Sequence, residues 1–165
     1  MKKFLENKND LIKYFEKGSK QKKFWKIGTE HEKFIYDLNT LNPIDYNGRN
    51  GIKSLFKLFK KKGWKEISEN KNPIALKKSG STISLEPRCQ IELSGGTVKS
   101  VHETCKQAKN YLDELKKICI KKKLGILGLG YYPKNFKKYT GWVPKKRYTI
   151  MRKRMKSTGS HGLEM

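Results

Sequence analysis

The sequence has few acidic residues and few arginines, and both shortages limit the kinds of molecule that the protein is expected to bind. There are 15 Asp and Glu against 39 Lys and Arg, which gives a net charge of +24. Such a charge is typical of proteins that bind nucleic acid or anionic membranes. However, only five of the basic residues are arginine, the side chain that best reads phosphates and base edges. The lysines are spread over the whole chain, which indicates a compositional bias, so we expect no specific nucleic-acid partner.

Long apolar runs and closely spaced cysteines are also missing. No stretch approaches the roughly 18 apolar residues of a membrane span, and the first residues lack the apolar segment of a signal peptide. We therefore expect no membrane partner. The three cysteines, Cys89, Cys105 and Cys119, are an odd number without tight spacing, which is typical of a reduced compartment. Together these features predict a cytoplasmic protein.

The chain does contain a mixed series of helical and strand-like segments. Apolar residues at three- or four-residue steps predict helices at residues 10–16, 52–63, 98–122 and 147–155. Runs rich in β-branched and aromatic residues predict strands at residues 24–36, 64–67, 74–78, 82–85, 90–93 and 124–132. Residues 37–50 read as a loop. This order of helices and hairpins predicts an α+β fold with an antiparallel sheet.

A first acidic pair lies in the segment formed by residues 28–32 (GTEHE). Glu30 and Glu32 are two residues apart, so in a strand they point to the same face, about 7 Å apart. Carboxylates in this arrangement repel each other unless a cation lies between them, and Mg²⁺ prefers carboxylate oxygens. The alternative is an exposed face with lysine neighbours, and this motif alone favours that alternative.

A second acidic pair lies in residues 85–96 (LEPRCQIELSGG). Glu86 and Glu92 share the same parity, and Pro87 indicates an edge or a bulge, which often re-aims side chains beside a site. A solvent-exposed face is again the alternative. If the two segments lie side by side, they gather four carboxylates, so we predict one metal site formed by Glu30, Glu32, Glu86 and Glu92.

A cationic cluster lies in residues 145–148 (KKRY), followed by Arg152 and Arg154. Positive charge near a carboxylate–metal site suits an anionic substrate or a phosphate. Without that context, the better interpretation is another stretch of the basic background.

Together these segments resemble the plant- and proteobacterial-type glutamate–cysteine ligases. The matching residues follow the same order along the chain: 27–34 (IGTEHEKF), 83–87 (ISLEP), 90–95 (QIELSG), 101–105 (VHETC), 127–130 (LGLG), 133–134 (PK), 144–145 (PK), 147–148 (RY), 150–152 (IMR), 159 (G) and 162–165 (GLEM). Five or more collinear motifs make the resemblance specific.

The resemblance implies a glutamine-synthetase-like fold, an antiparallel sheet with flanking helices that is incomplete in this chain. Residues 1–165 would then be the truncated N-terminal part of a single catalytic domain, inactive by itself. It further implies that Mg²⁺ ions bridge ATP and the γ-carboxylate of L-glutamate, which is phosphorylated. The amine of L-cysteine then displaces phosphate to give γ-glutamylcysteine, the first step of glutathione biosynthesis.

The family pattern assigns metal binding to Glu30, Glu32, Glu86 and Glu92, and substrate binding to Arg147. No protein nucleophile is implied, since phosphoryl transfer depends mainly on placed cations. One departure is Arg88-Cys89, where the family usually has two glycines, and Lys146 also replaces a glycine. Two alternatives are a carboxylate–amine ligase with another amine acceptor and a small basic nucleic-acid-binding domain.

Cys105 shares an apolar stripe with Val101, Ala108 and Leu112 in the predicted helix 98–122. The resemblance implies that the matching cysteine of plant relatives joins a regulatory disulfide. The stripe instead predicts a buried, structural cysteine, since free cysteine is often buried.

Overall fold

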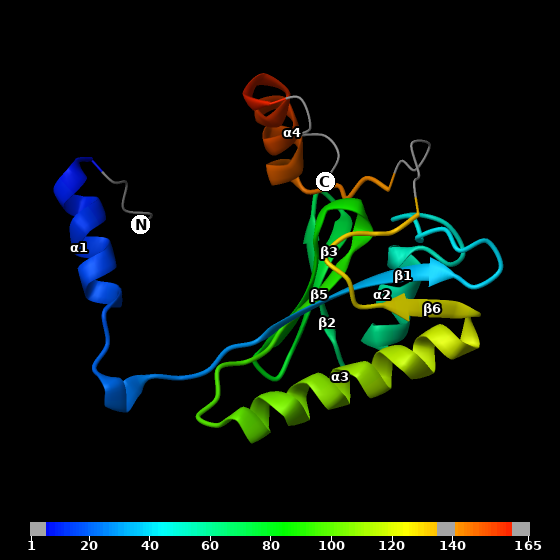
Figure 1. Ribbon diagram of the computed structural model, residues 1–165, viewed down its shortest axis with the longest axis horizontal. Coiled ribbons are helices and arrows are strands. Elements are labelled where there is room, and N and C mark those ends of the chain that lie inside the picture. Colours follow the sequence, from blue (N-terminus) through cyan, green and yellow to red (C-terminus); the bar gives the residue numbers. More distant parts are fainter. Residues whose placement is uncertain (1–5, 135–140, 160–165) are drawn as a thin grey trace.

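The computed structural model describes residues 6–134 and 141–159. In these residues, four helices and one six-stranded antiparallel sheet confirm the α+β prediction (Figure 1). The helices are α1 (Lys8–Gly18), α2 (Ile52–Lys60), α3 (Val101–Lys121) and α4 (Lys146–Thr158). The strands are β1 (Glu30–Asp37), β2 (Lys65–Glu69), β3 (Asn72–Lys78), β4 (Ser81–Leu85), β5 (Ile91–Ser94) and β6 (Leu124–Leu127).

The sheet has the order β2-β3-β4-β5-β1-β6. Strands β2 to β5 form a meander, and β1, although first in the chain, lies between β5 and β6. Its pairing with β5 and with β6 is antiparallel in both cases. This order places the two acidic segments of the sequence, in β1 and around β5, on neighbouring strands.

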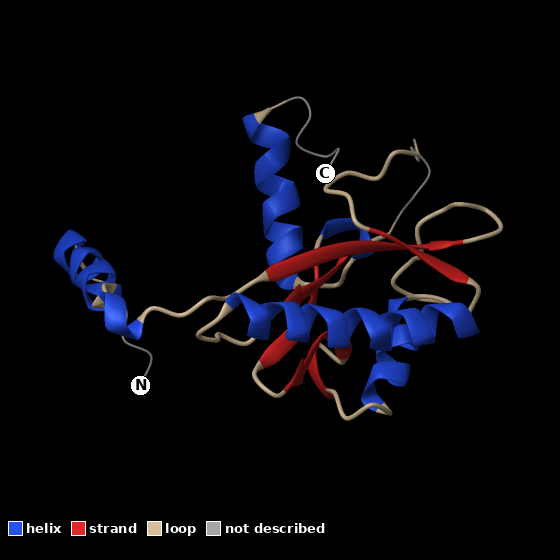
Figure 2. Cartoon of the chain, turned by 60° about the horizontal axis from the view of Figure 1, so that its bottom comes forward, coloured by secondary structure: helices blue, strands red, loops and turns tan. Residues whose placement is uncertain are grey.

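The hydrophobic core lies on one face of the sheet, under α2 and α3. In α2 the residues at three- and four-residue spacing are buried, namely Ile52, Leu55, Phe56 and Phe59. On the strands, alternate residues such as Ile83 and Leu93 face the same core. Figure 2 shows α3 running across the strands, while α4 leads away from the sheet. Lys145, just before α4, contacts Leu85 at the end of β4. The intervening residues of β1, β4 and β5 therefore point to the face opposite the core.

Helix α3 begins three residues later than predicted because Ser100 caps it. The Ser100 side chain accepts from the Glu103 amide, and the Glu103 carboxylate accepts from the Ser100 amide. This reciprocal pair is a capping box, which satisfies amides that a helix start otherwise leaves unpaired. The buried stripe of α3 contains Thr104, Tyr111 and Leu115. No helix in the described ranges is both long and apolar enough to cross a membrane.

The prediction that Cys105 is buried is wrong, because Cys105 is exposed on α3. The buried stripe begins at Thr104, so Cys105 lies to one side of it, and Val101 is exposed as well. By contrast, Cys89 and Cys119 are buried.

Two strands were predicted too long. The predicted strand 24–36 begins only at Glu30, because residues 22–24 form a 3₁₀ turn and Ile27 makes only an isolated bridge to Val98. The predicted strand 124–132 ends at Leu127, where its pairing with β1 ends.

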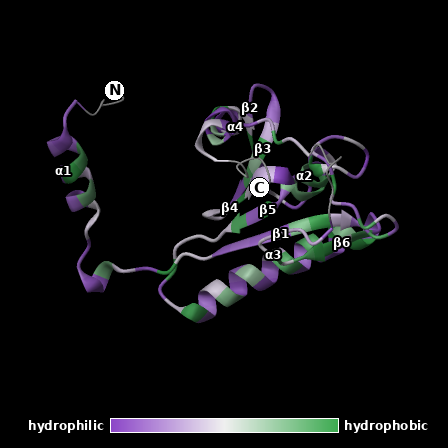
Figure 3. Cartoon of the chain, turned by 45° about the horizontal axis from the view of Figure 1, so that its top comes forward, coloured by the Kyte–Doolittle hydropathy of each residue, from purple (hydrophilic) through white to green (hydrophobic). Residues whose placement is uncertain are grey.

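Helix α1 begins at Lys8, two residues before its predicted start at residue 10, with Asn7 as its cap. It lies apart from the sheet (Figure 3) and buries none of its residues. It nevertheless carries exposed aromatic side chains such as Tyr14 and Phe15.

Candidate metal and substrate site

Three neighbouring strands place predicted metal ligands in register. Glu32 of β1 lies opposite Glu92 of β5, which lies opposite Ser84 of β4. Opposed residues of antiparallel neighbours point to the same face, so these three side chains form one row across the sheet. Glu30 lies opposite Ser94 and begins a second row on that face. Glu30, Glu32 and Glu92 therefore share one face of the sheet.

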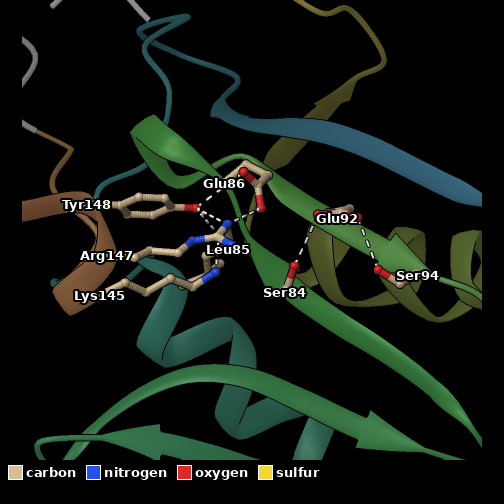
Figure 4. Close-up of polar contacts among 8 residues, drawn as sticks. All are labelled: Ser84, Leu85, Glu86, Glu92, Ser94, Lys145, Arg147 and Tyr148. Carbon is tan, nitrogen blue, oxygen red and sulfur yellow. Dashed lines mark hydrogen bonds and ion pairs between the residues drawn. The ribbon is translucent and has the colours of Figure 1, made fainter. Parts of the chain in front are cut away.

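Glu92 is the most enclosed of the four predicted ligands, with 8% of its surface exposed. Its two carboxylate oxygens accept hydrogen bonds from Ser84 Oγ at 3.2 Å and Ser94 Oγ at 3.0 Å (Figure 4). A buried carboxylate needs such partners, because burial without hydrogen bonds is costly. The two serines fix the direction of the Glu92 side chain.

Glu86 follows β4 directly and is brought back toward β5 by a tight turn. The turn, Pro87–Cys89, is closed by a hydrogen bond from the Glu86 amide to the Gln90 carbonyl at 2.8 Å. Arg88 and Cys89 have positive φ angles of 59° and 63°. This is the left-handed region that glycine adopts most easily. The two positions where the resemblance leads us to expect glycine are therefore ones where the backbone adopts a conformation that favours glycine.

Burial is the main cause that raises the pKa of the Glu86 carboxyl group above its ordinary value. The positive charges of Lys145 and Arg147 oppose this effect, whereas the nearby Glu92 carboxyl adds to it. Two acidic groups close enough to influence each other in this way favour the binding of a cation between them.

Arg147 contacts Glu86 of this cluster, and its role in substrate binding stays a prediction. Its guanidinium donates to Glu86 Oε1 at 3.0 Å and to the Tyr148 hydroxyl at 3.1 Å (Figure 4). The side chain is 58% exposed, so its ion pair with Glu86 is screened by solvent. An exposed guanidinium beside a carboxylate cluster is available to an incoming anion.

Lys145 is a site residue that the sequence interpretation assigned to the basic background. It is 8% exposed, and its ammonium group donates to the Leu85 carbonyl. Burial is the main cause that lowers its pKa, and the charge of Arg147 adds to this, while Glu86, Glu92 and Glu69 oppose it. The signal in the sequence was the KKRY cluster itself, but one buried lysine cannot be told from many exposed ones by composition.

Tyr148 and Gln90 also belong to the site without having been predicted there. The Tyr148 hydroxyl donates to the Leu85 carbonyl at 2.6 Å and lies 3.3 Å from Glu86 Oε2. The buried Gln90 amide donates to the Leu129 carbonyl at 3.3 Å. Both roles depend on contacts between segments far apart in sequence.

The donor set on this face fits a hard divalent cation, because it consists of carboxylate and hydroxyl oxygens. The register places Glu32 beside Glu92, and Glu86 lies near Glu92. Glu30 and Glu32 are exposed. In the part of the chain that the structure describes, no three acidic, cysteine or histidine side chains already converge in a metal-holding group. Metal binding by the four glutamates therefore stays a prediction.

A family model and individual relatives both place the chain in the same protein family. Residues 26–165 match the sequence model of Glutamate-cysteine ligase family 2 (GCS2). The chain is 41% identical over 162 residues to glutamate–cysteine ligase, chloroplastic, of Medicago truncatula, covering 96% of this chain and 31% of that protein. The values for glutamate–cysteine ligase A, chloroplastic, of Oryza sativa subsp. japonica are 41% over 158 residues, 96% and 32%. The chain thus spans about a third of the length of the curated relatives it matches.

The names of these relatives contradict the predicted cytoplasmic location. Each of the matched proteins, including that of Nicotiana tabacum at 40% identity, is named as chloroplastic, which points to the chloroplast instead. Cysteine usage cannot separate the two locations, because three cysteines without close spacing also suit other reducing compartments. The family itself is clear from the length and identity of the matches: this chain belongs to Glutamate-cysteine ligase family 2.

Proposed function

We propose that this chain forms part of an ATP- and Mg²⁺-dependent ligase that joins the γ-carboxylate of L-glutamate to the amine of L-cysteine. The product is γ-glutamylcysteine, the first intermediate of glutathione biosynthesis. The observation that carries the proposal is the register of Glu32 with Glu92, with Glu86 close by, on the open face of the sheet. We also propose that this sheet is part of a glutamine-synthetase-like catalytic domain.

Within this proposal, Glu30, Glu32, Glu86 and Glu92 hold Mg²⁺. When bound, Mg²⁺ neutralises the charge of the phosphates and of the substrate carboxylate. Ser84 and Ser94 hold the Glu92 side chain in the direction it needs. The exposed guanidinium of Arg147 binds a carboxylate or phosphate oxygen of the substrates.

The reaction proceeds in two displacements. An oxygen of the glutamate γ-carboxylate attacks the terminal phosphorus of ATP, and ADP leaves with the bridging oxygen. The cysteine amine then attacks the acyl carbon, phosphate leaves, and the nitrogen loses a proton. The chain's own residues bind and orient the reactants, because neither step requires a protein nucleophile.

Metal binding is tested on the chain itself with Mn²⁺, which replaces Mg²⁺ and is detected by electron paramagnetic resonance. We expect Glu92→Gln and Glu32→Gln to weaken Mn²⁺ binding at least about 100-fold, since changes even beyond the direct ligands cost 10- to 100-fold. Asp113→Asn is the matched control, because Asp113 is an exposed carboxylate of α3 paired with Lys109. Equal affinities in all variants would contradict the metal site.

The activity is tested in a chimera in which residues 26–165 replace the matching segment of the Medicago truncatula relative. We expect phosphate release from ATP that requires both L-glutamate and L-cysteine and that Glu92→Gln abolishes. The Asp113→Asn chimera should keep its activity. Release that accepts other amines equally well would instead favour the alternative ligase.

A further inference from the structure

The peptide unit between Leu85 and Glu86 is held by hydrogen bonds at both ends. On one side, the Leu85 carbonyl accepts from the Tyr148 hydroxyl at 2.6 Å and from the Lys145 ammonium (Figure 4). On the other side, the Glu86 amide donates to the Gln90 carbonyl at 2.8 Å. Because a peptide unit is planar, these contacts together fix the orientation of the whole plane.

This fixed plane determines where the Glu86 side chain starts. The plane ends at the Glu86 Cα, from which the carboxylate projects toward Arg147 and Tyr148. Leu85 itself is fully buried, so the β4 side of the plane is held by the core. A rotation of the plane would break at least one of the three hydrogen bonds, so Glu86 has little freedom at its backbone.

A buried lysine at position 145 is not explained by fold stability alone. Burying an ammonium group is unfavourable, and an apolar side chain of similar size often does as well in a core. Its ammonium lies 5.3 Å from the centre of the Tyr148 ring, so the two side chains support each other at the same carbonyl. Lys145 and Tyr148 both belong to one short segment, residues 145–148, which contacts the end of β4.

We infer that Lys145 and Tyr148 are positioning residues, which fix the Glu86 carboxylate beside Glu92 by holding the Leu85 carbonyl. This inference deepens the proposed function and rests on it, since it gives Glu86 its place as a metal ligand. Lys145 thus differs in role from Arg147, which pairs with the Glu86 carboxylate itself and stays open to an anion, whereas the Tyr148 hydroxyl contacts both the Leu85 carbonyl and Glu86 Oε2.

The first test measures hydrogen exchange of the Glu86 amide in the full chain by mass spectrometry. We expect Tyr148→Phe to speed this exchange about fivefold more than the exchange of β3 amides, because one hydrogen bond of the unit is lost. Tyr111→Phe is the matched control: Tyr111 is buried, and within the described residues its hydroxyl has no hydrogen-bond partner. A Tyr148→Phe variant with unchanged Glu86 exchange, or with equally faster exchange everywhere, overturns the inference.

The second test uses Mn²⁺ affinity in the same variants. We expect Tyr148→Phe and Lys145→Met each to weaken binding about tenfold, as partners of metal ligands do. The double variant should lose less than the product of the two, because both groups act through one carbonyl. Additive losses, or no loss, overturn the inference. If the unchanged chain binds no Mn²⁺, the proposed function fails, and the exchange experiment alone decides whether the two residues position Glu86.

Discussion

Arg88 and Cys89 occupy consecutive backbone positions with positive φ in the turn that returns the chain from Glu86 to Gln90. For a residue other than glycine, the left-handed region costs about 1 to 2 kcal/mol. The fold keeps this cost because the turn brings Glu86 back to Glu92. The sequence indicated these two positions, since the resemblance led us to expect glycine at both.

Replacing Arg88 by glycine should therefore stabilise the chain. The change relieves about 1 to 2 kcal/mol of backbone strain, while the greater freedom of unfolded glycine costs about 0.5 to 1 kcal/mol. We expect Arg88→Gly to raise the free energy of unfolding by roughly 0.5 to 1 kcal/mol, measured by urea denaturation. A destabilised variant would mean that the Arg88 side chain contributes more than the turn costs.

The three cysteines should differ sharply in reactivity. Burial raises the pKa of the Cys119 thiol to about 12, and Cys89 is buried as well, whereas Cys105 is exposed. At pH 8 the Cys119 thiolate is therefore scarce and shielded. We expect iodoacetamide to label Cys105 first, as followed by peptide mass spectrometry. Labelling should extend to the other two only after denaturation; early labelling of Cys119 would contradict the packing of α3.

Among single residues, the sequence was most informative about the glutamates and least informative about their partners. Parity within each segment was enough to place Glu30 with Glu32. It could not show that Lys145 is buried, because the other lysine of the cluster, Lys146, looks the same in sequence and is exposed. Burial of this lysine results from packing against β4, which is a contact between distant segments.

Among the elements, α3 is tied to the sheet through one acidic residue. Glu114 accepts hydrogen bonds from Trp64 Nε1 and from Lys78 Nζ, both at 2.8 Å. Trp64 precedes β2 and Lys78 ends β3, so the carboxylate joins α3 to the first hairpin of the meander. Lys78 also lies over the Trp64 ring, 5.6 Å from its centre.

Removing this carboxylate should weaken the packing of α3. We expect Glu114→Ala to lower the free energy of unfolding by about 1 to 3 kcal/mol, because the indole N–H of buried Trp64 and the half-buried Lys78 ammonium lose their acceptor. The neighbouring Asp113→Ala is the control and should cost less than about 1 kcal/mol, since its pair with Lys109 is exposed. Thermal unfolding of the two variants measures the difference; equal losses would show that the contact is not specific.

The predicted elements were correct in kind and less accurate in extent. Strands were predicted at residues 74–78 and 82–85, and the short connection between them closes the hairpin of β3 and β4, with Ser79 and Gly80 at positive φ. Strand ends were missed where apolar residues continue beyond the partner strand, as after Leu127. The composition of a segment indicates that it forms a strand, but the end of the strand depends on where its hydrogen-bonded neighbour ends.

For the whole molecule, the antiparallel sheet was predictable, but its strand order was not. Alternation cannot reveal that β1 lies between β5 and β6, because nothing in its sequence distinguishes a central strand from an edge strand. That order is nevertheless what brings Glu32 beside Glu92. The candidate site is therefore a property of the topology as much as of its residues.

The position of β1 also has a consequence for the time course of folding. Strand β1 leaves the ribosome first, yet its partners, β5 and β6, are made much later. The meander β2–β5 needs only local contacts, so it should form early, whereas β1 must wait for a long loop to close. We expect pulsed hydrogen exchange during refolding to protect amides of β3 and β4 before those of β1; simultaneous protection would contradict this order. On this view, the carboxylates of the two acidic segments meet only in the last step, and a nascent chain cannot gather the proposed metal ligands until its sheet is complete.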